Sequence, residues 1–226
     1  MIDSFSMQTD LIIFIDKSII AVNKPSGLRT IPDGYDKSKE NLQTLLKPEF
    51  PELMTVHRLD KETSGVILFA RNKEVHRNLN HQFENRLIRK KYWVISHNIP
   101  DWETITARFP LNLNGDRQHR TIIDQFGKLS ETHFTRHKFD QEKCLSFLEA
   151  IPHTGYTHQI RAHLSFLGLS ILGDLLYTKG LSSNQRELNK SVNRMMLHAA
   201  SIEFFHPEIN QKIIINTDAP FSIDNL

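Results

Sequence analysis

Residues 57–71 constrain the fold most, because they join a cluster of charged side chains to a short apolar run. The run, residues 66–70, is too short for an ordinary helix and is rich in β-branched and aromatic residues, which predicts a buried strand. Gly65 directly before it suits a tight turn or a close approach of two backbones. Asp60 is therefore expected on a loop just ahead of a core strand, where a rigid scaffold can hold a functional side chain. A lone loop Asp is more often a turn former, so its neighbours must carry any functional argument.

Composition describes an ordinary globular protein. The 226 residues suffice for one substantial core, built as two subdomains, with 39% hydrophobic and 24% charged residues. No apolar run approaches the roughly 18 residues of a membrane span, and the N-terminus lacks the basic segment of a signal peptide. We therefore expect a cytoplasmic protein without membrane contact. Cys144, the single cysteine, excludes a disulfide framework, and its apolar neighbours predict a small core residue.

Positive charge is concentrated between residues 71 and 91. Seven basic residues stand there against two acids, a net of +5 in a protein whose overall formal charge is +2. Such a stretch predicts either a solvated helix face or a contact with an anionic partner. Its proposed phosphate contacts are Arg71, Arg77, Arg89, Lys90 and Lys91. In the loop of residues 23–28, Lys24 either reaches a phosphate or lies in a simple turn.

Hydrophobic patterning predicts many short strands with a few helices between them, an α+β fold. The expected strands are 11–15, 19–22, 66–70, 92–95, 103–108, 120–124, 130–137, 144–150, 196–205 and 212–216. The expected helices are 41–47, one that follows the N-cap Asn72, and 158–168 with Thr157 as N-cap and Gly168 as its stop. Residues 177–194 are expected to form a mobile loop. We expect one domain over residues 11–220, with tails at 1–10 and 221–226.

Arg161 falls in the first turn of the helix expected at 158–168. A cation there is disfavoured by the helix dipole, so this arginine needs another reason for its position.

Five motifs together resemble the RluA family of pseudouridine synthases. They are Asn-Lys-Pro-Ser-Gly-Leu at 23–28, His-Arg-Leu-Asp at 57–60 with Thr-Ser-Gly at 63–65, Lys-Lys-Tyr at 90–92, His-Thr-Gly at 153–155 with Thr-His-Gln-Ile-Arg-Ala-His at 157–163, and Leu-His-Ala at 197–199. They cover almost the whole chain in order. The resemblance implies a mixed, mainly antiparallel sheet in two subdomains flanked by helices, with a central active-site cleft.

The resemblance also implies residue roles. Asp60 matches the essential catalytic aspartate, Tyr92 an active-site tyrosine that stacks near the target uracil, and Arg161 the basic residue that pairs with the aspartate. Arg58 matches an arginine beside the target site. The same motifs nominate further substrate-binding residues, namely Lys24, His57, Thr63, His158, Gln159 and Leu197. Tyr156 stands where relatives often carry Arg or Lys, and the chain begins its catalytic domain too early to hold the S4 RNA-binding module of some relatives.

The implied reaction isomerises uridine in RNA to pseudouridine. It needs no metal, redox cofactor or activated donor, so we expect none. Its substrate is expected to be a structured ribosomal or transfer RNA with an exposed uridine, because the base must leave its stack to meet Asp60. We expect the enzyme to act as a monomer.

Three other interpretations of the sequence are a metal site, a silent RNA-binding protein and an unrelated hydrolase. The 12 histidines include no HExxH motif, and His158 and His163 are five residues apart, so a metal site is not expected. A catalytically silent RNA-binding protein of the same fold would have no need of Asp60, Tyr92 and Arg161 together. An unrelated hydrolase with an Asp nucleophile would want a second acid nearby, for which Glu62 is the sole candidate.

Overall fold

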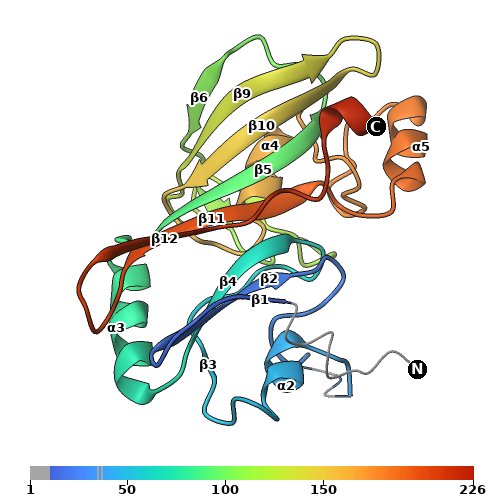
Figure 1. Cartoon of the computed structure of the whole chain (residues 1–226). Coiled ribbons are helices and arrows are strands. Elements are labelled where there is room, and N and C mark those ends of the chain that lie inside the picture. Colours follow the sequence, from blue (N-terminus) through green and yellow to red (C-terminus); the bar gives the residue numbers. More distant parts are fainter. Residues whose placement is uncertain (1–10, 35, 37) are drawn as a thin grey trace, which may run out of the picture. The chain divides into compact units, whose positions relative to one another are not determined.

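The computed structural model describes residues 11–34, 36 and 38–226 and divides into two compact units (Figure 1). Unit 1 comprises Met1–Arg89 and Ala199–Asp218, and unit 2 comprises Lys90–His198 and Ala219–Leu226. The expected N-terminal tail at 1–10 lies outside the described residues. No helix in the described part of the chain is long and apolar enough to cross a bilayer.

Unit 1 is built on a sheet with strand order β1, β2, β4, β11, to which β12 adds beside β11 and β3 beside β4. The strands are β1 (Ile12–Ile15), β2 (Ile19–Lys24), β3 (Met54–Thr55), β4 (Ser64–Ala70), β11 (Leu197–Phe205, whose first two residues belong to unit 2) and β12 (Lys212–Asn216). The helices are α2 (Leu42–Leu46) and α3 (Lys73–Glu84). The pairs β1–β2, β2–β4, β3–β4 and β11–β12 are all antiparallel. Strand β4 is buried along its whole length, which confirms the predicted core strand.

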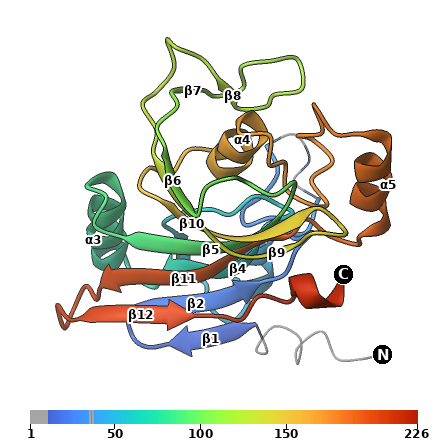
Figure 2. The same cartoon turned by 90° about the horizontal axis from the view of Figure 1, so that it is seen from above.

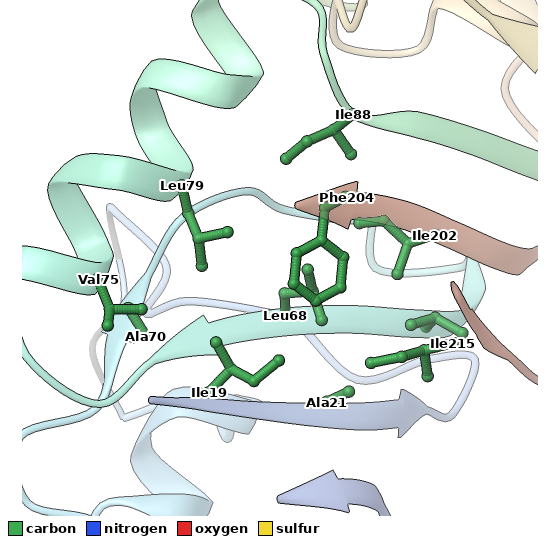
Figure 3. Close-up of a cluster of buried hydrophobic side chains, with 11 residues drawn as sticks. Ile19, Ala21, Leu68, Ala70, Val75, Leu79, Ile88, Ile202, Phe204 and Ile215 are labelled. Carbon is green, nitrogen blue, oxygen red and sulfur yellow. The ribbon is translucent and has the colours of Figure 1, made fainter. Parts of the chain in front are cut away.

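The core of unit 1 forms where α3 packs on β4 (Figure 3). Asn72 caps the helix by accepting a hydrogen bond from the Val75 amide, as predicted. Val75 and Leu79 then lie on one face of α3 and meet Leu68 and Phe204 of the sheet. The i, i+4 spacing of the apolar residues thus decides which face of α3 is buried.

Gly65 marks a close approach of β4 and β11, as its position before the apolar run predicted. Its φ is +110°, and a Cβ at this position would lie 2.2 Å from the carbonyl oxygen of Ala199. A side chain is therefore excluded by both conformation and space.

Unit 2 has strands in the order β5, β10, β9, β6 and a separate β7–β8 hairpin. The strands are β5 (Arg89–His97, beginning at the last residue of unit 1), β6 (Thr104–Ala107), β7 (Leu111–Asn112), β8 (Ile122–Ile123), β9 (Thr132–Asp140) and β10 (Leu145–Pro152). The helices are α4 (Gln159–Phe166), α5 (Ser183–Ser191) and the short 3₁₀ helix η1 (Ile223–Asn225). Helix α4 lies between the sheet and the β7–β8 hairpin (Figure 2). Its Ile160 and Leu164 pack with Val94 and Leu148 of the sheet.

Four predictions for unit 2 were wrong. The expected loop at 177–194 contains α5, which begins with a capping box in which Ser182 and Gln185 exchange hydrogen bonds. The expected C-terminal tail forms η1 and buries Ile223. Cys144 is exposed at the turn between β9 and β10, where it has a φ of +52°, and is no core residue. His158, with a φ of +56°, replaces Thr157 as the N-cap residue of α4.

Candidate active site

The loop that carries Asp60 is fixed by hydrogen bonds from residues 24–30 of the same unit. The Gly27 amide donates to the Lys61 carbonyl at 2.9 Å, and Ser26 Oγ donates to the Glu62 carbonyl at 2.7 Å. Thr30 Oγ1 both donates to the Leu59 carbonyl at 3.0 Å and accepts from the Leu59 amide at 3.2 Å. Asp60 itself is half-buried. The backbone on both sides of Asp60 is therefore held in place by a second loop.

Lys24 is part of this support and has no exposed surface. Its Nζ donates to the carbonyls of Pro25 at 2.9 Å, Leu28 at 2.7 Å and Lys61 at 3.0 Å. The prediction of a phosphate contact does not fit this environment, because an ammonium has three donors and three carbonyls take them. Lys24 instead ties its own loop to the loop of Asp60.

His57 and Thr63 flank Asp60 and are also tied to the fold of unit 1. His57 Nε2 accepts a hydrogen bond from the Leu68 amide at 2.9 Å, and its ring lies 4.8 Å from the ring of Phe83. Thr63 is buried, and its amide donates to the Asp60 carbonyl at 3.1 Å. Arg58 is exposed. Of the substrate-binding residues nominated in this loop, Arg58 is thus the one whose side chain faces solvent.

In unit 2, Arg161 forms a buried two-point ion pair with Asp174. Arg161 Nε lies 2.7 Å from Asp174 Oδ2, and Nη2 lies 2.9 Å from Oδ1. The side chains are 7% and 0% exposed. The guanidinium also lies 5.0 Å from the ring centroid of Tyr177. These contacts supply the reason for a cation in the first turn of α4.

Asp174, the buried partner of Arg161, is a residue that sequence reasoning missed. Its Oδ1 also accepts from the amides of Leu176 at 2.9 Å and Tyr177 at 3.2 Å, so the carboxylate orders its own loop as well as Arg161. Asn189 of α5 donates to the Asp174 carbonyl at 2.8 Å. The signal in the sequence was the Gly-Asp dipeptide at 173–174 after an apolar run. Gly173 is required there, because a Cβ would lie 2.0 Å from the Arg194 carbonyl oxygen.

The residues beside Arg161 on α4 differ in their surroundings. Gln159 is buried, and its amide group bonds to Thr154 Oγ1 at 2.7 Å, the Tyr156 amide at 3.2 Å, the Glu131 carbonyl at 3.0 Å and Thr132 Oγ1 at 2.9 Å. Gln159 therefore organises the 153–156 loop, and its nomination as a substrate contact does not fit this use of its side chain. His158 Nδ1 lies 3.3 Å from the Tyr177 hydroxyl.

Tyr92 and Leu197 both pack on the core cluster of unit 2. Leu197 is buried in that cluster, whereas Tyr92 is half-buried at its edge. Tyr92 lies on β5 opposite Ala150 of β10. The sheet register therefore decides where the tyrosine ring stands.

Of the five proposed phosphate contacts, two have exposed side chains and three are partly buried. Arg77 and Arg89 are exposed. Arg71 is held within unit 1, where its Nη1 donates to the Asp16 carbonyl and its guanidinium lies 5.5 Å from the Phe50 ring centroid. Lys91 lies 4.0 Å from a carboxylate oxygen of Glu149 and 5.0 Å from the Trp93 ring centroid.

Lys90 is the most perturbed of these cations. It is half-buried, and burial lowers its pKa from 10.5 to about 8. A Cβ at Gly155 would lie 3.1 Å from Lys90 Nζ, so the glycine leaves room for the ammonium beside the 153–155 loop.

Among the residues that the structure describes, no group of three or more His, Cys, Asp or Glu side chains is placed to hold a metal ion.

Comparison with known proteins assigns the chain to a family. A family model described as RNA pseudouridylate synthase matches residues 18–166. The dual-specificity RNA pseudouridine synthase RluA of Vibrio vulnificus is 34% identical over 201 residues, 87% of this chain and 78% of that protein. The ribosomal large subunit pseudouridine synthase C of Buchnera aphidicola is 37% identical over 216 residues, 91% of this chain and 66% of that protein.

Among solved structures, human RNA pseudouridylate synthase domain containing 1 has a similar fold. It superposes with a TM-score of 0.77 and 26% identity, over 94% of this chain and 84% of that one. The chain therefore belongs to the RluA family of RNA pseudouridine synthases, enzymes that isomerise uridine to pseudouridine.

Proposed function

We propose that this enzyme isomerises specific uridines in structured ribosomal or transfer RNA, with Asp60 as its essential catalytic carboxylate. The observation that carries the proposal is the rigid support of the Asp60 loop. Residues 59, 61 and 62 on either side of Asp60 all hydrogen-bond to residues 24–30. A loop held this firmly gives one carboxylate a defined position without a metal or cofactor to orient it.

The choice of RNA rests on the relatives. One is named for the large ribosomal subunit, and another is named as dual-specific. We extend ribosomal RNA to this chain on that ground and keep transfer RNA as the other candidate. Either substrate is encountered in the cytoplasm.

The chemistry asked of Asp60 is limited. The N1–C1′ bond breaks, the detached uracil rotates, and C5 bonds to C1′, while the C5 proton leaves and N1 gains a proton. An ionised Asp60 either attacks the nucleoside or removes a sugar proton to start this sequence. Tyr92 supplies a flat apolar face and a hydroxyl for the uracil. Arg161 supplies a cation, which favours the ionised form of a nearby carboxylate.

Binding of the RNA relies on exposed cations. Arg77, Arg86 and Arg89 are exposed in unit 1 and are suited to phosphate contacts. Because such contacts release counterions, affinity is expected to fall as salt rises. The target base must also unstack, which costs a few kcal/mol and is easiest in loops and bulges.

The test is chemical mapping of pseudouridine in unmodified ribosomal and transfer RNA transcripts and in partly assembled ribosomal particles. The proteins compared are wild type, Asp60→Asn and the matched control Asp218→Asn, which changes an exposed carboxylate of unit 1 in the same way. We expect new pseudouridine with wild type and Asp218→Asn, and none with Asp60→Asn.

Two other outcomes contradict the proposal. Equal modification by Asp60→Asn would remove Asp60 from its catalytic role. No modification by any of the three proteins, with tight RNA binding intact, would instead support a silent RNA-binding protein.

A further inference from the structure

A basic pocket of about 260 Å³ adjoins the Asp60 loop within unit 1. It lies between two segments, residues 29–34 and residues 58–61. Its lining consists of Arg29, Thr30, Ile31, Pro32, Asp33, Gly34, Arg58, Leu59 and Lys61. None of the substrate-binding residues nominated from the sequence, other than Arg58, belongs to it.

The walls of the pocket are held by backbone hydrogen bonds on both sides. The Arg29 and Thr30 carbonyls accept from the amides of Leu42 at 2.8 Å and Gln43 at 3.1 Å, at the start of α2. On the other side, Thr30 Oγ1 holds Leu59 through the reciprocal pair of hydrogen bonds described above. The pocket is therefore present before any ligand arrives, which lowers the entropic cost of binding.

The charge of the lining selects the ligand. Three cations, Arg29, Arg58 and Lys61, face one carboxylate, Asp33. Arg29 Nη2 lies 3.0 Å from Asp33 Oδ2, so Asp33 offsets one of the three positive charges. Arg58 has no ion pair with any described residue. Lys61 has a surface pair with Glu62 at 3.3 Å, and such exposed pairs are weak and easily exchanged for a better anion. Arg58 and Lys61 thus leave an excess of positive charge in the pocket.

Two of the cations that line the pocket are close neighbours of Asp60 in the sequence. Arg58 is two residues before Asp60 and Lys61 one residue after it, so their Cα atoms lie within about 7.6 Å and 3.8 Å of the Asp60 Cα. An anion between these side chains is close enough to belong to a nucleotide that adjoins the target uridine.

We propose that this pocket binds the phosphate of an RNA nucleotide next to the target uridine, with Arg58 and Lys61 as its ligands and Arg29 as the third cation. The proposal rests on the proposed function, because it uses the same RNA. Ile31, Pro32 and Leu59 give the pocket an apolar wall against which the ribose of that nucleotide packs.

The first experiment measures binding of an RNA stem-loop with a uridine-only loop at several salt concentrations. For single-stranded RNA, log K falls as log salt rises, and each lost phosphate contact makes this negative slope shallower by about 0.7. We expect that change for Lys61→Gln and for Arg29→Gln. Arg29→Lys keeps the charge and should keep the wild-type slope.

The matched control is Lys47→Gln, an exposed lysine of unit 1 outside the pocket. Its slope is expected to equal that of wild type. Slopes for Arg29→Gln and Lys61→Gln equal to that of Lys47→Gln would overturn the proposal. Thermal unfolding of each variant shows that the fold is intact.

The second experiment locates the contact. The stem-loop that contains the mapped uridine is made with one neutral methylphosphonate linkage on either side of that uridine. One of the two should weaken wild-type binding, and the same linkage should have little effect on Lys61→Gln. If the methylphosphonate weakened the binding of Lys61→Gln as much as that of wild type, the two effects would be additive, and Lys61 would not contact that phosphate. Failure of the proposed function can be told apart from failure of this proposal. In the first case no pseudouridine is mapped, whereas the salt slopes of the variants still report whether the pocket binds RNA.

Discussion

At the scale of single residues, Lys24 is a buried cation whose side chain joins the 24–30 loop to the loop of Asp60. A lysine in a Pro- and Gly-containing loop suggests an exposed cation. In the structure Lys24 is fully buried, and its Nζ donates to carbonyls from two loops. Its sequence neighbours do not reveal this, because Lys61 is 37 residues away.

The role of Lys24 can be tested by Lys24→Met, which keeps the length and apolar stem of the side chain but removes its donors. Three carbonyls lose a charged partner, so we expect the free energy of unfolding to fall by about 2–4 kcal/mol. Urea denaturation measures this change. Arg77→Met, an exposed control in the same unit, should leave stability within about 0.5 kcal/mol of wild type. A stable Lys24→Met protein with weakened RNA binding would restore the phosphate role.

At the scale of elements, α4 and the loop that follows it depend on one carboxylate. Arg161 projects from the first turn of α4, and Asp174 reaches it from the loop after Gly173. Helix α5 contributes through Asn189, whose Oδ1 accepts from the Gly173 amide and whose Nδ2 donates to the Asp174 carbonyl. Asp174 is therefore a positioning residue for Arg161.

Asp174→Asn should separate this role from simple packing, since the amide has nearly the same volume but only one good acceptor oxygen. A buried Arg161 would lose its charge partner in unit 2, so we expect a loss of about 3–5 kcal/mol of stability. We also expect a lower kcat for pseudouridine formation with little change in KM, because the guanidinium would be misplaced. Asp174→Glu should recover part of kcat if orientation matters. Wild-type stability and kcat in Asp174→Asn would contradict this role.

At the scale of the whole molecule, two buried histidines, His97 and His163, are expected to lower stability in mild acid. Burial lowers the pKa of His97, although a hydrogen bond with Asn189 partly opposes this, and His97 Nδ1 has no partner among the described residues. Burial likewise lowers the pKa of His163, against a hydrogen bond with the Phe109 carbonyl. When the pH falls below 6.5, the ordinary histidine pKa, these two histidines become protonated in the unfolded chain but stay neutral in the folded chain.

Stability is therefore expected to be full above about pH 6.5 and to fall as the pH drops from there toward 5. Urea denaturation at pH 7.5, 6.5, 6.0 and 5.5 measures the effect. His97→Gln removes one of the two groups, so its stability should fall less steeply over this range, even if it starts lower. An identical slope in wild type and His97→Gln would show that His97 titrates normally in the folded protein.

Much of the fold was predictable from local patterns. Strand β4, the cap of α3 by Asn72 and the close approach at Gly65 were each confirmed, because their causes lie within a few residues of sequence. Helix α5 was missed although its Ser182 and Gln185 capping box is a local signal, because a polar composition was read as a loop. The catalytic assignment of Asp60 stays a prediction, because neither a local pattern nor a hydrogen bond demonstrates chemistry.

The sequence by itself determined the family, the α+β class and the motif residues, because those depend on residue types and their order. Only the tertiary structure decided which motif side chains form the buried hydrogen bonds that support the fold. Lys24 and Gln159 were nominated as substrate contacts, yet both satisfy buried backbone groups. The ion pair of Asp174 with Arg161 and the basic pocket beside the Asp60 loop were found only in the tertiary structure. The physical reason is that hydrogen bonds and ion pairs join segments far apart in the chain, and composition does not record such partners.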